Sequence, residues 1–415
     1  MHRILRCKYL QGGHLYANYR EIFRLHSLGL NKTEIASSCW CARNTVAATL
    51  QRAANCGLQW PMPGEMSDKQ LSERLFPSSP SKPAYKMPDY CEEFSMILTD
   101  YFLSTPDLQW RLAKQAGVRH AVVRLPEDEA FDMTDPAHIR AVAERFKAEG
   151  LRPLVVEPMP NSVHDHIKRA DALRDASIEK VLQMIPLLAE NGFTTICMNF
   201  MAEIGWLRTT SVYPERGGVH VTGFDLRDVS VDPALSIGAD TLWANLQYFL
   251  DAVVPQAERY GIRLAIHPDD PPLAKIGNVS RILISRDAMQ KAIDLHKSDC
   301  LGITMCQANF AAMGEDVYEC IEHFGRQGKI FFVHFRDIAG TKACFHETFH
   351  DNGQTDMARA IRCYRDVHCT APIRIDHVPT MAGEANNRPG YETVGRLYAI
   401  GYLRGLMDAS GYDLL

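Results

Sequence analysis

The chain has 415 residues, 46% of them hydrophobic, and a mean hydropathy of −0.19. This composition indicates a soluble globular protein with enough chain for a large core, and the absence of any run of about 18 apolar residues argues against a membrane span. The first residues lack the apolar segment of a secretory signal. Twelve cysteines follow no framework spacing, so we expect them to be reduced in a cytoplasmic protein.

The net charge of −5 is unevenly distributed along the chain. Residues 1–90 carry 12 Lys and Arg against 6 Asp and Glu, whereas the remainder carries 33 against 44. A basic head on an acidic body predicts two units with different partners.

The basic head shows short helical patterns. Ile22, Leu25 and Leu28 fit one face of a helix that Gly29 ends, and a second helix is expected to start after Asn31. This spacing predicts two short helices joined by a tight turn.

A third helix is expected to follow, with Val46 and Leu50 on its buried face. Arg43, Asn44 and Thr45 stand at its start. Helix, turn and helix, with polar residues opening the last helix, is the helix-turn-helix pattern of DNA-binding proteins. These three residues are therefore the candidates for contacting DNA.

Residues 15–77 resemble the N-terminal DNA-binding segment of insertion-sequence transposases. The resemblance implies a helix-turn-helix segment over 1–77, and the Ser-, Lys- and Pro-rich stretch over 78–94 is expected to be a linker. An alternative is that the head is a fused relic or follows a mis-called start, with the native chain beginning near Met96.

Beyond the linker, over 95–415, short β-rich runs alternate with amphipathic helical stretches. Eight such units without a Gly-rich nucleotide fingerprint predict a (β/α)8 barrel, and a doubly wound open sheet is the alternative. The predicted strands are 96–102, 120–125, 153–158, 194–200, 263–268, 301–306, 330–335 and 373–376.

The last four of these strands end in metal-binding side chains: His267, Cys306, His334 and Asp376. In a (β/α)8 barrel the C-terminal strand ends meet at one mouth, so the four side chains are expected to lie together there. Two imidazoles, a thiolate and a carboxylate suit a divalent ion such as Mn²⁺, Fe²⁺, Co²⁺ or Zn²⁺.

Several stretches of the body resemble signatures of the mannonate dehydratase family, whose members are xylose-isomerase-like barrels, and the resemblance covers nearly all of 96–408. The stretches are CMNF (197–200), GWLRT (205–209), IHPDDPP (266–272), VHFRDI (333–338), FHETFHDNGQTDM (345–357), RIDHVP (374–379) and PGYETVGRL (389–397).

This resemblance implies a hydro-lyase of hexuronate catabolism. The implied reaction converts D-mannonate to 2-keto-3-deoxy-D-gluconate with Mn²⁺ or Fe²⁺ held by the four ligands named above. The family's acid/base pair falls on His377 and Tyr391, and either could be the acid. Barrels of this superfamily are often oligomeric, so we expect a homo-oligomer.

Further polar residues are candidates for binding the sugar acid. Arginine binds carboxylates through two parallel hydrogen bonds, which makes Arg208 a candidate clamp. Asn199 ends the fourth strand, His164 follows the third, and His350 and Asp351 lie on the loop after the seventh. We expect these five side chains to line the mouth.

Two other functions remain open at this stage. One is a metal-dependent sugar isomerase or epimerase on the same barrel, against which the cysteine ligand speaks, since such sites are usually rich in carboxylates. The other is a DNA-binding regulator whose barrel senses a sugar acid, for which the basic head is the argument.

Overall fold

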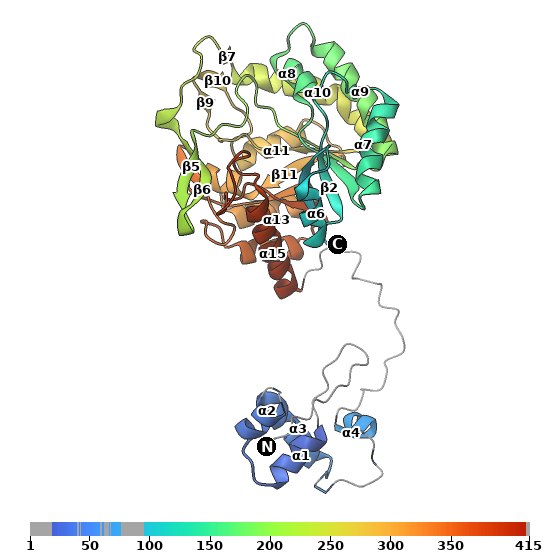
Figure 1. Ribbon diagram of the computed structural model, residues 1–415. Coiled ribbons are helices and arrows are strands. Elements are labelled where there is room, and N and C mark those ends of the chain that lie inside the picture. The colour runs from blue at the N-terminus through green and yellow to red at the C-terminus, as the bar shows by residue number, and fades with distance from the viewer. Residues whose placement is uncertain are drawn as a thin grey trace. The chain divides into compact units, whose positions relative to one another are not determined.

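The computed structural model describes residues 19–39, 41, 43–58, 60–61, 66, 68–75 and 95–411. It separates into two units, Met1–Pro88 and Asp89–Leu415 (Figure 1). The predicted linker at 78–94 lies outside the described residues. Among the described helices, none combines the length and apolarity needed to span a bilayer.

The N-terminal unit contains the three expected helices and one more: α1 (Tyr19–Ser27), α2 (Lys32–Ser38), α3 (Arg43–Asn55) and α4 (Asp68–Leu75). Asn31 caps α2 and forms a capping box with Glu34. Ile22 is buried as expected, but Leu28 is 62% exposed. The reason is that α1 ends at Ser27, and Gly29 at a φ of +84° turns the chain away.

The second unit is a closed barrel of eight parallel strands, which confirms the predicted fold and excludes the open sheet. The strand order around the barrel is β1-β15-β12-β11-β8-β4-β3-β2. All eight predicted strands are present: β1 (Ile97–Leu103), β2 (His120–Arg124), β3 (Arg152–Val156), β4 (Thr195–Met198), β8 (Arg263–Ile266), β11 (Leu301–Cys306), β12 (Ile330–Phe335) and β15 (Pro372–Ile375).

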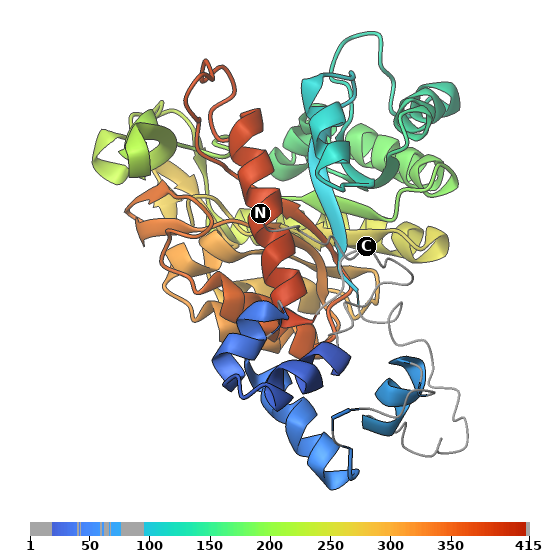
Figure 2. The ribbon, with the colours of Figure 1, turned by 60° about the horizontal axis from the view of Figure 1, so that its bottom comes forward.

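Helices cover the outside of the barrel, and the last one, drawn in red, runs along it (Figure 2). Their apolar faces pack on the outward-facing strand residues and form the main core, while a smaller cluster that includes Val122, Val155 and Phe332 fills the interior. The helices are α6 (Leu108–Gln115), α7 (Pro136–Ala148), α8 (Asn161–Arg169), α9 (Arg174–Glu190), α10 (Ala239–Tyr260), α11 (Arg286–Asp294), α12 (Gln307–Met313), α13 (Val317–Arg326), α14 (Met357–Asp366) and α15 (Thr393–Ser410).

Two small sheets grow from the C-terminal side of the barrel. One has the order β13-β14-β6-β5 and the other β7-β10-β9, and they share an apolar cluster with Phe224, Ile276 and Phe345. Because their strands lie in the loops after β4, β8 and β12, they build up the wall of the mouth. The strands are β5 (Thr210–Glu215), β6 (Val219–Asp225), β7 (Ser236–Ile237), β9 (Lys275–Ile276), β10 (Asn278–Ser280), β13 (Ile338–Thr341) and β14 (Cys344–Glu347), with 3₁₀ turns at Arg216–Gly218 and Leu226–Asp228.

Candidate active site

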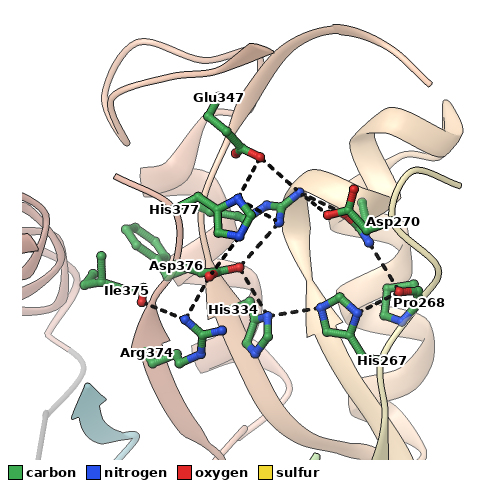
Figure 3. A network of polar contacts seen from close by, with 12 residues as sticks. His267, Pro268, Asp270, His334, Glu347, Arg374, Ile375, Asp376 and His377 are labelled. Carbon is green, nitrogen blue, oxygen red and sulfur yellow. Dashed lines mark hydrogen bonds and ion pairs between the residues drawn. The ribbon is translucent and has the colours of Figure 1, made fainter. Parts of the chain in front are cut away.

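The four predicted metal ligands come from four neighbouring barrel strands, β8, β11, β12 and β15. Cys306 ends β11, His334 lies in β12, and His267 and Asp376 directly follow β8 and β15. The ligand atoms of the two histidines and the cysteine lie within 4.8 Å of one another. His334 Nδ1 is 3.1 Å from His267 Nε2 and 3.4 Å from Asp376 Oδ2 (Figure 3).

Protein oxygens hold the far side of each imidazole ring, so that one nitrogen of each ring faces the other ring. His267 Nδ1 donates to the carbonyl of Pro268 at 2.6 Å, and His334 Nε2 faces Glu157 Oε1 at 2.9 Å. These contacts fix both rings with His267 Nε2 facing His334 Nδ1, and a metal ion bound between them would take the place of the protons on these nitrogens. Two imidazole nitrogens that bind one ion at about 2.1 Å lie roughly 3 Å apart, so the observed spacing fits a shared metal ion.

The electrostatics of this position favour a cation and an ionised thiol. Burial and Arg374 oppose protonation of His334, but Glu157 and Asp376 raise its pKa well above the ordinary value. Burial likewise opposes ionisation of Cys306, yet Arg336 and hydrogen bonds from the two histidines lower the pKa of its thiol to about 6. A thiolate is the form of cysteine that binds metal.

A buried ion-pair network surrounds these ligands. It joins three arginines to four carboxylates: Arg208, Arg336 and Arg374 with Glu157, Asp270, Glu347 and Asp376. Burial opposes ionisation of the four carboxyl groups, but the arginines lower the pKa of each. With the Cys306 thiolate the anions exceed the arginines by two, and a bound divalent ion makes the charges balance. Buried charges are stable only when paired.

A second metal-capable group shares His334 through its other nitrogen, with Glu157 and Cys197. This side suits a metal poorly. Burial raises the pKa of the Cys197 thiol to about 11, so it stays protonated. The guanidinium of Arg374 also lies 2.8 Å from Glu157 and would repel a cation.

His377 and Tyr391 meet beside the ligand cluster, with ring centroids 5.3 Å apart. A β-bridge in which Val378 N–H donates to the Gly390 carbonyl at 2.9 Å closes the loop between them. His377 has a φ of +41°, a sparsely populated conformation for a non-glycine residue that is typical of functional sites.

The two side chains differ in their protein partners. His377 Nδ1 lies 2.9 Å from Glu347 Oε1, which fixes the ring and leaves Nε2 for other contacts. The Tyr391 hydroxyl donates to Asp376 at 3.3 Å. Burial, reinforced by the Asp376 charge, raises the pKa of Tyr391 well above its ordinary value, so the phenol stays protonated.

A cavity of about 350 Å³ opens onto these groups. Six of the residues named from the sequence line it: Asn199, His267, His334, Asp376, His377 and Tyr391. Cys306 is fully buried and does not line the cavity. The cavity and its lining therefore bring the proton-transfer candidates and the metal-capable group to one place.

Four of the five predicted sugar-acid contacts lie outside the cavity lining, and Arg208 is the most informative of them. Its guanidinium is 2.6 Å from both Asp270 and Glu347, with a side chain only 3% exposed. Because Glu347 in turn holds His377, the structure places Arg208 behind the site rather than in it.

The other three are held by the protein in different ways. His350 Nε2 donates to the Phe335 carbonyl at 2.7 Å. Asp351 pairs with Arg216 at 2.8 Å on the surface loop. His164 is buried against Phe200 and Phe249. His164 follows β3 within α8, and His350 and Asp351 lie on the loop after β12, as expected, but none of the three lines the cavity.

Some cavity residues escaped the sequence analysis. Arg336 and Arg374 each lie two residues from a predicted ligand, a spacing that puts both on the ligand's face of the strand. This two-residue spacing was the sequence signal that could have identified the two arginines. Tyr101, Lys168 and Trp206 also line the cavity, although none of them was a candidate for the site.

Comparison with known proteins gives a consistent assignment. A family model described as D-mannonate dehydratase (UxuA) matches residues 102–235 and 232–412. The chain is 33% identical over 301 residues to mannonate dehydratase 2 of Halalkalibacterium halodurans, covering 65% of this chain and 86% of the relative. It is 31% identical to the mannonate dehydratase of a Streptococcus agalactiae strain, covering 71% and 91%.

Solved structures agree with this. The crystal structure of mannonate dehydratase from Streptococcus suis serotype 2 superposes with a TM-score of 0.71 at 29% identity, covering 77% of this chain and 95% of that one. A xylose isomerase domain protein from Planctomyces limnophilus, with a TM-score of 0.51 and 12% identity, shares the fold.

Fold and site together define a metal-dependent barrel enzyme of the xylose-isomerase-like kind. Within that class, the chain belongs to the D-mannonate dehydratase family.

Proposed function

We propose that the chain removes water from a sugar acid, D-mannonate in the first place, to give 2-keto-3-deoxy-D-gluconate. The observation that carries this proposal is the meeting of His377 and Tyr391 with the metal-capable group in one cavity. Dehydration needs one group to take a weakly acidic C2 proton and another to protonate a poor leaving group at C3.

We propose that His267, Cys306, His334 and Asp376 hold the ion, as Mn²⁺ or Fe²⁺. The facing imidazole nitrogens, the lowered thiol pKa and the charge balance support this set. When bound, a divalent ion supplies Lewis-acid stabilisation of the negative charge that develops on the substrate carboxylate.

The hydrogen bonds suggest how the proton-transfer roles divide. His377, oriented by Glu347, accepts the C2 proton at Nε2. Tyr391, which stays protonated, donates to the C3 hydroxyl, which leaves as water. The enol so formed gains a proton at C3 and loses one from its C2 hydroxyl, which yields the 2-keto acid and restores both side chains.

The deciding experiment is turnover by metal-stripped protein to which Mn²⁺ or Fe²⁺ is returned. We expect 2-keto-3-deoxy acid from D-mannonate only after metal is restored. Product from another aldonate would keep the mechanism and change the substrate. If no aldonate reacts while the metal is bound, an isomerase or epimerase reaction becomes the better assignment.

The ligand set has its own test, independent of turnover. Cys306→Ala should lose its metal during dialysis, measured as metal content per chain by mass spectrometry. Cys300→Ala is the matched control, because that cysteine lies away from the cavity lining. Equal metal retention in the two variants would remove Cys306 from the set.

We propose a second function for the N-terminal unit, binding of duplex DNA. Arg43 and Asn44 are exposed and Thr45 is half-buried at the start of α3, while α2 and α3 pack through Ile35 and Val46. Full-length protein should bind DNA with an affinity that falls steeply between about 50 and 200 mM salt. Arg43→Ala should weaken it, and Lys180→Ala in the barrel should not. Salt-independent or absent binding would contradict this function.

A further inference from the structure

Helix α8 presents a polar stripe to the cavity. Asn161, Asp165 and Lys168 recur at the spacing of one helix face, and all three line the cavity. Val163 and Ile167, on the other side of the helix, are buried in the core. The amphipathic pattern that docks α8 on the barrel therefore also turns a row of donors and acceptors toward the site.

Lys168 is unusual within this stripe because its charge is buried. The residue is 2% exposed, and its ammonium has one hydrogen-bond partner among the described residues, Asp165 at 3.2 Å. An ammonium carries three N–H donors, so two are left over. Burial lowers the pKa of Lys168. A buried cation with unused donors beside a cavity is poised to bind a ligand.

The barrel order places this stripe across the mouth from the reacting groups. β3, which leads into α8, stands four strands from β12 in either direction around the barrel. His334 comes from β12, and His377 follows the neighbouring β15. A linear substrate whose carboxylate end lies at the ligand cluster extends its other end toward α8.

We propose that Lys168, paired with Asp165, binds the distal hydroxyls of the aldonate, those beyond C3, and so selects for chain length. The proposal rests on the dehydratase function proposed above. The pair offers donors from the ammonium and acceptors from the carboxylate, which is the combination that polyol hydroxyls require.

The test uses the full-length, metal-loaded protein with Lys168→Met, which keeps the aliphatic stem and removes the charge, and with Asp165→Asn. Lys180→Met, an exposed lysine on the adjacent α9, is the control. Calorimetric binding and steady-state kinetics compare D-mannonate with the glycerate enantiomer that matches its C2 configuration but lacks carbons beyond C3.

For Lys168→Met we expect about 10- to 100-fold weaker binding of D-mannonate and a matching rise in KM, with kcat little changed. Asp165→Asn should weaken binding in the same direction. Binding of glycerate should be unaffected in both variants. Equal losses for the two ligands, or a fall in kcat alone, would overturn the assignment.

The experiment distinguishes failure of the proposed dehydratase function from failure of the proposed Lys168 subsite. Wild-type protein that binds D-mannonate without dehydrating it would refute the dehydratase function, while the calorimetric comparison would still decide the role of Lys168. Wild-type protein that binds glycerate as tightly as D-mannonate would refute the distal subsite directly.

Discussion

Glu347 contacts His377 and Asp376 accepts a hydrogen bond from Tyr391, and this difference separates the roles that we propose for the two side chains in proton transfer. Asn in place of His377 should abolish exchange of the D-mannonate C2 hydrogen with deuterated solvent, because the base is gone. Tyr391→Phe should retain exchange and lose turnover by about 10²- to 10⁴-fold, because only the acid is gone. Proton NMR follows exchange, and a coupled assay follows turnover.

Tyr398→Phe, on the exposed face of α15, is the control and should behave as wild type. The opposite pattern, with exchange lost in Tyr391→Phe and kept in the His377 variant, would reverse the two roles.

A second prediction for a single residue concerns Asp337 and the pH dependence of protein stability. Burial raises the pKa of its carboxyl to about 6, even though Thr355 and Ile338 donate hydrogen bonds to it. A carboxyl with a raised folded pKa is destabilising when ionised. The destabilisation from the ionised carboxylate is therefore absent below about pH 4, grows as pH rises from about 4 to about 6, and is constant at higher pH.

The raised pKa of Asp337 corresponds to a loss of about 3 kcal/mol in the free energy of unfolding between pH 4 and pH 7. Asp337→Asn removes the titration but also weakens the hydrogen bonds, so only the pH dependence is diagnostic. The free energy of unfolding of wild type relative to the variant should fall between pH 4 and pH 7. A difference that stays flat with pH would contradict the raised pKa.

At the scale of elements, the first turn of α15 sits directly on the loop that carries His377. A Cβ at Gly395 would overlap the Pro379 carbonyl oxygen and press on Val378. Gly395→Ala should therefore displace the loop that returns to Tyr391, with a loss of about 1–3 kcal/mol in stability and a clear loss of kcat.

Gly401 provides the control on the same helix, because nothing lies within 4 Å of a Cβ placed there. Gly401→Ala should be neutral or stabilise the helix by up to about 1 kcal/mol. Thermal melts and initial rates measure both variants. If the two behave alike, the close packing at Gly395 has no role in positioning the loop.

The sequence predicted the elements whose pattern is local. Every barrel strand is a short apolar run, and every proposed ligand position follows from the end of such a run. The hairpin of β5 and β6 escaped prediction, because no residue of β5 is buried and the pairing of β6 with β14 is set by the tertiary fold. Side-chain direction was also beyond reach, since Arg208 and His350 turn toward protein partners that only the folded chain supplies.

For the whole molecule, the distribution of the active site predicts which part of the chain turnover needs. The cavity lining spans Tyr101 to Tyr391, and the main core runs from Met96 to Met407, all within the second unit. A chain beginning at Ser95 should therefore fold and keep kcat and KM within about twofold of the full chain, because it contains the whole cavity lining and the whole main core. Its DNA affinity should be lost, since that depends on the basic first unit. Circular dichroism checks folding, and parallel assays compare turnover and DNA binding. Loss of turnover in a folded barrel would show that the N-terminal unit takes part in the reaction.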